Sequence, residues 1–211
     1  MKFAILTLTL TVFGLGASAQ VSPYVFPDFV KASVLQKNGA AADGTLDYNT
    51  ISQEMLFLQD GVKTVLDMSN VDTIYLQDKK FVPVSGAICY QKLTETKIPL
   101  YVQLINKPLL HGRNPDLAEQ ANNTITSSQG IVNAKTTSAK YDMKFAEGYT
   151  LEPLSVYYFQ KGKSFTKIDD LKKVIKLFPD KEAAITAFVK ENHTDLKNAD
   201  DLAKLNIFCN K

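Results

Sequence analysis

The sequence from Val71 to Val84 reads VDTIYLQDKKFVPV, two apolar-rich runs on either side of a charged turn. Successive side chains of a β-strand point to opposite faces, so the apolar residues of these two runs fall on both sides of a hairpin, with the charges near its turn. The pattern predicts a β-hairpin, and we place its turn at Asp78-Lys79, with Leu76 opposite Phe81. The question is whether its charged and hydroxyl side chains form a site or only a fold.

A stronger hairpin precedes it in QEMLFLQDGVKTVLD, residues Gln53 to Asp67. Asp60-Gly61 favours a two-residue type I′ turn, because both positions of that turn need a positive φ. This turn sets a register in which Leu56 faces Val65. Apolar residues fall on both faces of the hairpin, so the sequence predicts a sheet that is covered on part of each face.

A third hairpin is predicted from Ile88–Tyr90, through a polar turn, to Leu100–Val102. Turn signals recur every ten to fifteen residues between Asp43 and Ile105, which is typical of an antiparallel meander. Pro99 has no N–H to give to a ladder, so the last strand is expected to begin at an edge or to pair late. We expect a β-rich region over residues 20–165.

The end of the chain changes to the period of an α-helix. Thr166 with Asp169 and Asn198 with Asp201 resemble helix-capping pairs, and Pro179 ends the first apolar stripe. Three short amphipathic helices must bury their stripes against one another or against the sheet. The predicted fold is therefore α+β: an antiparallel β-meander followed by three short C-terminal α-helices, with residues 166–211 packing on the sheet.

The first residues have the three parts of a signal peptide. Lys2 is followed by an uncharged run and then by Ala17-Ser18-Ala19, so we predict a signal peptide over residues 1–19. The alternative is an uncleaved N-terminal anchor. The rest of the chain has no second long apolar run, so no transmembrane segment is expected after cleavage. The predicted location is outside the cytoplasm, either periplasmic or extracellular.

Composition excludes several classes of function. A formal net charge of +2 gives no broad basic field for nucleic acid. Cys89 and Cys209 are the only cysteines, and an oxidising compartment permits a disulfide between them, although buried free thiols are the alternative. With only His111 and His193 beside them, no zinc site of the usual kind is expected. We predict no metal and no cofactor.

Three further regions raise functional questions. Residues 107–140 are poor in aromatics and predict a long surface loop, either functional or slack, whose clustered polar residues are His111, Arg113 and Asp116. The run Tyr157–Phe159 is either a sugar-stacking platform or half core and half sheet surface. Lysines gather near the first helix and indicate either an anion-binding patch or a solvated face: Lys161, Lys163, Lys167, Lys172, Lys173 and Lys176.

No catalytic residue can be assigned. The chain has no Gly-x-Ser-x-Gly turn, no Gly-x-Gly-x-x-Gly and no Walker loop. Glu54 and Glu95 are interpreted as a solvated edge charge and a turn residue. Two hypotheses remain, and the sequence does not decide whether the protein is an enzyme. The first is a non-enzymatic binding protein for an unknown protein or glycan partner, and the second is a hydrolase with carboxylates in a cleft between sheet and helices.

Several stretches together resemble a family of secreted proteins of Bacteroidetes-type bacteria that has no assigned activity. They are TLDYNTISQEMLFLQDG, then VDTIYLQDKKFVPV, then LYVQ, and finally the helical end from LKKVIKLFPD to NIFCNK. The resemblance implies export and carries no catalytic residue. It also implies that Asp72-Thr73-Ile74 is an acceptor for O-glycosylation at Thr73, which the mass of the native peptide would test.

Overall fold

The computed structural model describes residues 22–110, 141, 145 and 149–211, and the predicted signal peptide lies outside them. Ten strands of the described chain form one antiparallel sheet in the order β12-β11-β8-β7-β6-β5-β1-β2-β3-β4, and β9 and β10 form a separate two-stranded ribbon. The strands are β1 (Val30–Gln36), β2 (Ala41–Asn49), β3 (Glu54–Gln59), β4 (Val62–Val65), β5 (Val71–Leu76), β6 (Lys79–Ser85), β7 (Ile88–Lys92), β8 (Leu100–Gln103), β9 (Asn106–Leu110), β10 (Tyr149–Pro153), β11 (Val156–Lys161) and β12 (Ser164–Lys167).

Three α-helices follow the sheet, as predicted: α4 (Leu171–Leu177), α5 (Glu182–Glu191) and α6 (Ala199–Asn210), with the short 3-10 helix η1 (Pro179–Lys181) before α5. Asn198 caps α6, because its side chain accepts hydrogen bonds from the backbone N–H groups of Asp200 and Asp201. The capping pair predicted at Thr166 is wrong. Thr166 lies in β12, and the carboxylate of Asp170 caps α4 by accepting from the N–H of Lys173 at 2.9 Å.

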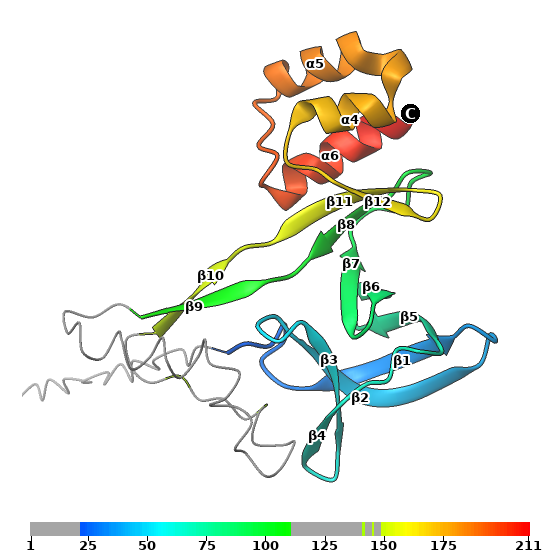
Figure 1. Cartoon of the computed structure of the whole chain (residues 1–211), viewed down its shortest axis with the longest axis vertical. Helices are drawn as coiled ribbons and strands as arrows, with labels where there is room; N and C mark the ends of the chain where they lie inside the picture. Colours follow the sequence, from blue (N-terminus) through cyan, green and yellow to red (C-terminus); the bar gives the residue numbers. More distant parts are fainter. Residues whose placement is uncertain (1–21, 111–140, 142–144, 146–148) are drawn as a thin grey trace, which may run out of the picture.

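The sheet carries two hydrophobic cores. Figure 1 shows the curled strands and the three helices, which enclose these cores, at opposite ends of the molecule. The first, here the strand core, is enclosed where β1 to β7 curl toward one another, and its largest members include Tyr48, Phe81 and Met55. The second, here the helix core, lies between the helices and the strands β8 and β11, and it includes Phe159 and Leu202. Helix α6 contacts strand β8 directly in this core.

The predicted hairpin registers are partly correct. Leu56 pairs with Val65, and the turn residues Asp60 and Gly61 both have positive φ, as expected. In the next hairpin the two turn residues are Gln77 and Asp78 instead of Asp78-Lys79, so that Leu76 pairs with Lys79. Alternation cannot separate these registers, because moving the pairing by two residues leaves every side chain on the same face.

Other strands differ in detail from the expectations. Strand β1, for which the sequence makes no prediction, lies between β2 and β5, so the antiparallel sheet joins the run β1–β4 to the run β5–β8 there. The predicted loop at 107–140 begins inside strand β9, and residues 111–140 lie outside the described chain. Of the two expectations for the strand after Pro99, the edge position is wrong, because β8 pairs with both β7 and β11, and its pairing begins at Leu100, after the proline.

The N-terminal segment Ser22–Phe29 is fastened to strand β2 by a buried carboxylate. Asp47 is fully buried and accepts hydrogen bonds from the backbone N–H groups of Phe26, at 3.2 Å, and Tyr48, at 2.7 Å. Burial raises the pKa of Asp47 to about 7, while these backbone hydrogen bonds act in the opposite direction. The buried carboxyl of Asp47, on strand β2, is thus an ionisable group next to the strand core.

Helix α6 is joined to the β7–β8 connection by a polar cluster centred on Asn206, which is also fully buried. The amide oxygen of Asn206 accepts from the hydroxyls of Thr94, at 2.7 Å, and Thr96, at 2.8 Å, and its amide nitrogen donates to the carbonyl of Ile98 at 2.7 Å. The side chain of Asn210 accepts from the N–H of Ile98 at 2.9 Å. These bonds hold the connection between the two cores.

Candidate functional site

A single row of side chains crosses eight strands on the sheet face that points away from both cores, here called the outer face. The row is read from the strand registers, in which each member is the direct cross-strand partner of the next. It consists of Asp43, Ser33, Tyr75, Lys80, Lys92, Tyr101, Tyr158 and Lys167. Because successive strands lie about 4.8 Å apart, such a row extends for roughly 30 Å.

Aromatic rings pack together at the β12 end of this row. The rings of Tyr90 and Tyr158 stack with their centroids 4.6 Å apart, and Phe165 meets Tyr90 and Tyr101 edge to face at 5.3 and 5.1 Å. These geometries are favourable for aromatic pairs. The Tyr158 hydroxyl donates to the side-chain oxygen of Gln103 at 3.1 Å. The rings cover one another and form one aromatic cluster on the outer face.

A shallow polar groove lies at the other end of the row, beside Tyr75. It has a volume of about 610 Å³, and its lining includes Lys31, Ser33, Asp43, Tyr75 and Gln77. Tyr75 is 42% exposed, which is unusual for a large aromatic side chain in the middle of a sheet. A groove with hydroxyl, amide and carboxylate groups beside an open ring can hold a ligand that has both apolar and hydrogen-bonding surfaces.

Two lysines lie directly opposite each other between the groove and the aromatic cluster. Lys80 pairs with Lys92 across β6 and β7, and their side chains are 30% and 16% exposed. Glu95, from the β7–β8 connection, binds both: one carboxylate oxygen lies 3.3 Å from the Lys80 nitrogen, and the other bonds to Lys92. The hydrogen bond from Lys92, followed by that from Lys80, lowers the pKa of Glu95.

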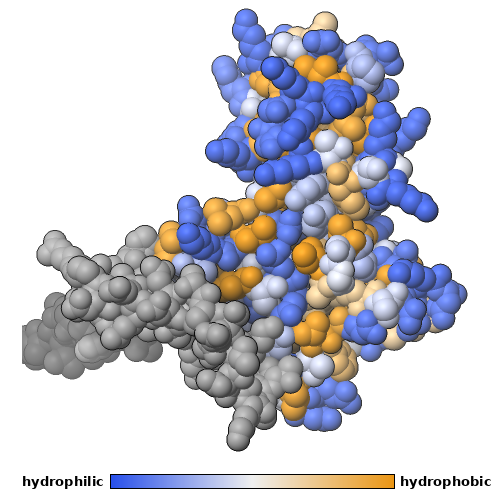
Figure 2. Space-filling view, viewed as in Figure 1, coloured by the Kyte–Doolittle hydropathy of each residue, from blue (hydrophilic) through white to orange (hydrophobic). Residues whose placement is uncertain are grey.

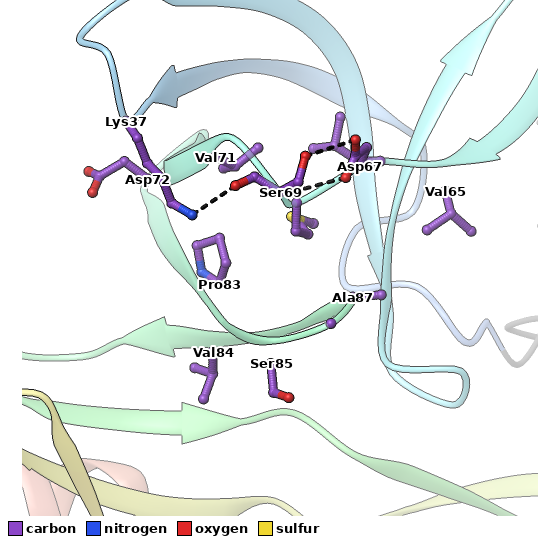
Figure 3. Close-up of a pocket in the computed structure, with 13 residues that line it drawn as sticks. Lys37, Val65, Asp67, Ser69, Val71, Asp72, Pro83, Val84, Ser85 and Ala87 are labelled. Carbon is purple, nitrogen blue, oxygen red and sulfur yellow. Dashed lines mark hydrogen bonds between the residues drawn. The ribbon is translucent and has the colours of Figure 1, made fainter.

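A pocket of about 620 Å³ lies elsewhere, between the β4–β5 connection and the β6–β7 turn. Figure 3 shows Asp67 and Asp72 on opposite sides of it, with Lys37 and Ser69 between them. Lys37 donates to the Ser69 carbonyl at 2.8 Å, while Asp67 accepts from the Ser69 N–H at 2.9 Å. The hydrogen bonds from the backbone N–H and the hydroxyl of Ser69 lower the pKa of Asp67. The two carboxylates therefore do not converge on a shared point where a substrate could bind.

The residues predicted as modification or pairing sites are placed as follows. Thr73 lies in β5, is 6% exposed, and donates to the neighbouring Asp72 carboxylate at 3.0 Å. O-glycosylation at this residue stays a prediction. Cys89 belongs to the strand core and Cys209 to the helix core, and both are free thiols in this structure. Burial raises the pKa of Cys89 to about 12 and that of Cys209 to about 11, so neither thiol is an activated nucleophile.

The other candidates of the sequence do not assemble into a site. His111, Arg113 and Asp116 lie outside the described residues, and His193 lies exposed after α5. Tyr157 and Phe159 enter the helix core while Tyr158 joins the outer face, so the run is half core and half sheet surface. Among the late lysines, Lys167 and Lys173 pair with Asp169.

Sequence reasoning missed the grouping of Lys80, Lys92 and Glu95. Glu95 was interpreted as a turn residue and its turn is correctly placed, but its carboxylate bridges two strands. Lys92 and Glu95 are three residues apart, which is a weak local signal. Lys80 lies fifteen residues from Glu95 in the sequence, and the two side chains meet only because β6 pairs with β7.

Comparison with known proteins finds no matching family model, no similar curated protein and no similar solved structure. In the described part of the chain, no helix combines the length and apolar character that a bilayer crossing requires. Among the same residues, no three His, Cys, Asp or Glu side chains gather as a metal site. The likeness to a secreted bacterial family stays a prediction.

Proposed function

We propose that this chain is an exported, non-enzymatic binding protein that holds a glycan or protein partner on the outer face of its sheet. The observation that carries the proposal is the groove beside Tyr75, which continues into the row of lysines and tyrosines. Tyrosine and lysine side chains on a strand surface bind a partner by stacking and by hydrogen bonding. A rigid sheet holds them in place without the cost of ordering a loop.

The structure gives less support to the hydrolytic alternative. A hydrolase would need two carboxylates, or a histidine and a carboxylate, that point into one cavity. The space between the sheet and the helices is occupied by the helix core, whose members include Leu100, Val174 and Leu205. In the pocket of Figure 3, Asp67 and Asp72 lie apart. Asp67 and Asp72 therefore do not form a carboxylate pair of the kind that hydrolysis needs.

The hydropathy of the surface agrees with a binding role for the sheet instead of the helices. Figure 2 shows mainly hydrophilic side chains over the helical end, whereas hydrophobic side chains gather over the strands in the middle of the molecule. Among the described residues, the exposed large hydrophobic side chains are Val62, Tyr75, Leu154 and Ile207, three of them in or beside strands. Tyr75 is the one that lines the polar groove.

The proposal is tested by the protein produced in its native host, immobilised, and exposed to soluble glycans and to envelope extract. Tyr75→Ala should weaken retention of the specific partner by about tenfold, since loss of one exposed aromatic anchor costs on the order of 1–2 kcal/mol. Val62→Ala is the matched control, because Val62 is also exposed but lies on edge strand β4. Equal retention by wild type and Tyr75→Ala would rule out the outer face as the binding surface.

A further inference from the structure

The pairing of Lys80 with Lys92 is unfavourable unless an anion lies between them. Like charges placed directly opposite each other on neighbouring strands repel, and these two lysines are held there by the β6–β7 register. The flanking row members are Tyr75 and Tyr101, neither of which carries a negative charge. The geometry is therefore that of a two-pronged cationic site on the outer face.

Glu95 shows which chemical group fits this site. Its two carboxylate oxygens are divided between the two ammonium groups, one to Lys80 and one to Lys92. The Glu95 side chain is 69% exposed and comes from the β7–β8 connection, not from either strand of the pair. Because Glu95 itself is exposed, an incoming carboxylate can reach the two ammonium groups in its place, while Lys80 and Lys92, at 30% and 16% exposed, stay held by the strands.

The surroundings of the two lysines indicate what else the ligand carries. The Lys80 ammonium lies 5.6 Å from the centre of the open Tyr75 ring, so the cationic site and the ring are adjacent. On the far side of Tyr75 the groove offers Ser33, Asp43 and Gln77 as hydrogen-bond partners. A ligand that places a carboxylate next to a flat apolar face and several hydroxyl groups fits this order of side chains. Acidic sugars have this composition.

We propose that the outer face binds an acidic polysaccharide, with Lys80 and Lys92 holding a uronate carboxylate, the sugar face on Tyr75 and its hydroxyls in the groove. Glu95 is then a built-in competitor that the bound carboxylate displaces. This inference rests on the proposed function and narrows its partner to one chemical class. The charge on the ligand makes the binding sensitive to salt, because attraction between exposed charges is screened within about 10 Å at 0.1 M salt.

The test compares polygalacturonate with the same polymer after methyl esterification, which removes the charge and keeps the sugars. Calorimetric titration of the full-length protein should show binding of the acid and at least tenfold weaker binding of the ester. Lys80→Met and Lys92→Met keep an unbranched apolar stem and should each weaken binding of the acid about tenfold. Glu95→Gln should tighten it three- to tenfold, because the competitor loses its charge while the loop keeps its hydrogen-bonding side chain. An unchanged urea midpoint shows that each variant is folded.

The possible outcomes separate this inference from the proposed function. Binding of a neutral glycan that depends on Tyr75 but not on the lysines would overturn the acidic ligand and leave the outer face as a binding surface. Equal binding of polyglutamate and polygalacturonate would overturn the sugar specificity. Weaker binding by Glu95→Gln would show that Glu95 supports the site instead of competing for it. Lack of binding of polygalacturonate by both wild type and Glu95→Gln would overturn the inference.

Discussion

The strand core and the helix core lie on the same side of one continuous sheet, yet they are closed in different ways. From β1 to β7 the sheet curls, so that β3 and β7 approach each other and the strands cover their own apolar face. From β8 to β12 the apolar face is covered by α4, α5 and α6. Curling requires contacts between strands distant in sequence, whereas the helices follow β12 directly in the chain and need only short connections.

The two regions meet at a narrow joint. Strands β7 and β8 share only the register pairs Gln91–Val102 and Lys92–Tyr101, because β8 then continues into the β9–β10 ribbon. The two lysines and Glu95 lie at this joint, with the tyrosine cluster on one side and the groove on the other. We expect the two cores to be separate cooperative units that are connected through the β7–β8 region.

The largest expected effect comes from removing a large ring from either core. Phe81→Ala in the strand core and Phe159→Ala in the helix core should each lower the free energy of unfolding by about 3–5 kcal/mol, since both rings are fully buried. Hydrogen exchange followed by mass spectrometry should show Phe81→Ala weakening protection mainly in β1–β6 and Phe159→Ala mainly in β8, β11 and the helices. Uniform loss of protection over the whole chain by either variant would show a single unit.

The next effect is the pH dependence of stability that the buried carboxyl of Asp47 should give the strand core. Asp47 has an ordinary pKa of 3.8, raised to about 7 by burial, so the folded protein holds this proton more tightly than the unfolded chain does. Stability should therefore fall as pH rises from about 4 to about 8, by at most about 4 kcal/mol at about 1.4 kcal/mol for each pKa unit. Urea denaturation at several pH values measures this dependence, and the free energy of unfolding of Asp47→Asn should not fall over the same pH range. Retention of the full wild-type slope in Asp47→Asn would assign it to another group.

The distance between interacting residues explains which parts of this fold could be predicted from the sequence. Asp60-Gly61 fixed its hairpin, since the turn and both strands are local, and the cap at Asn198 needed only three residues. The place of β1 beside β5 could not be predicted, because the pairing of Val34 with Ile74 spans forty residues and leaves no mark in either strand alone. The candidate site was missed for the same reason, since Lys80 and Glu95 meet only after β6 pairs with β7.

The smallest of the three expected stability changes comes from replacing Asn206, whose buried amide lies at the joint between the two cores. Its hydrogen bonds to Thr94, Thr96 and the Ile98 carbonyl connect α6 to the segment that links β7 and β8. Asn206→Ala leaves buried polar groups without this partner and should cost about 1–3 kcal/mol. Asn210→Ala is the control, because Asn210 is only partly buried and contacts the same Ile98 backbone from the next turn. Hydrogen exchange measured at increasing urea concentration gives an unfolding transition for each core. If the joint couples the cores, these two transitions should coincide in the wild type and occur at different urea concentrations in Asn206→Ala. If the two transitions remain superimposed, the cores are coupled through the strands β7 and β8 and not through α6.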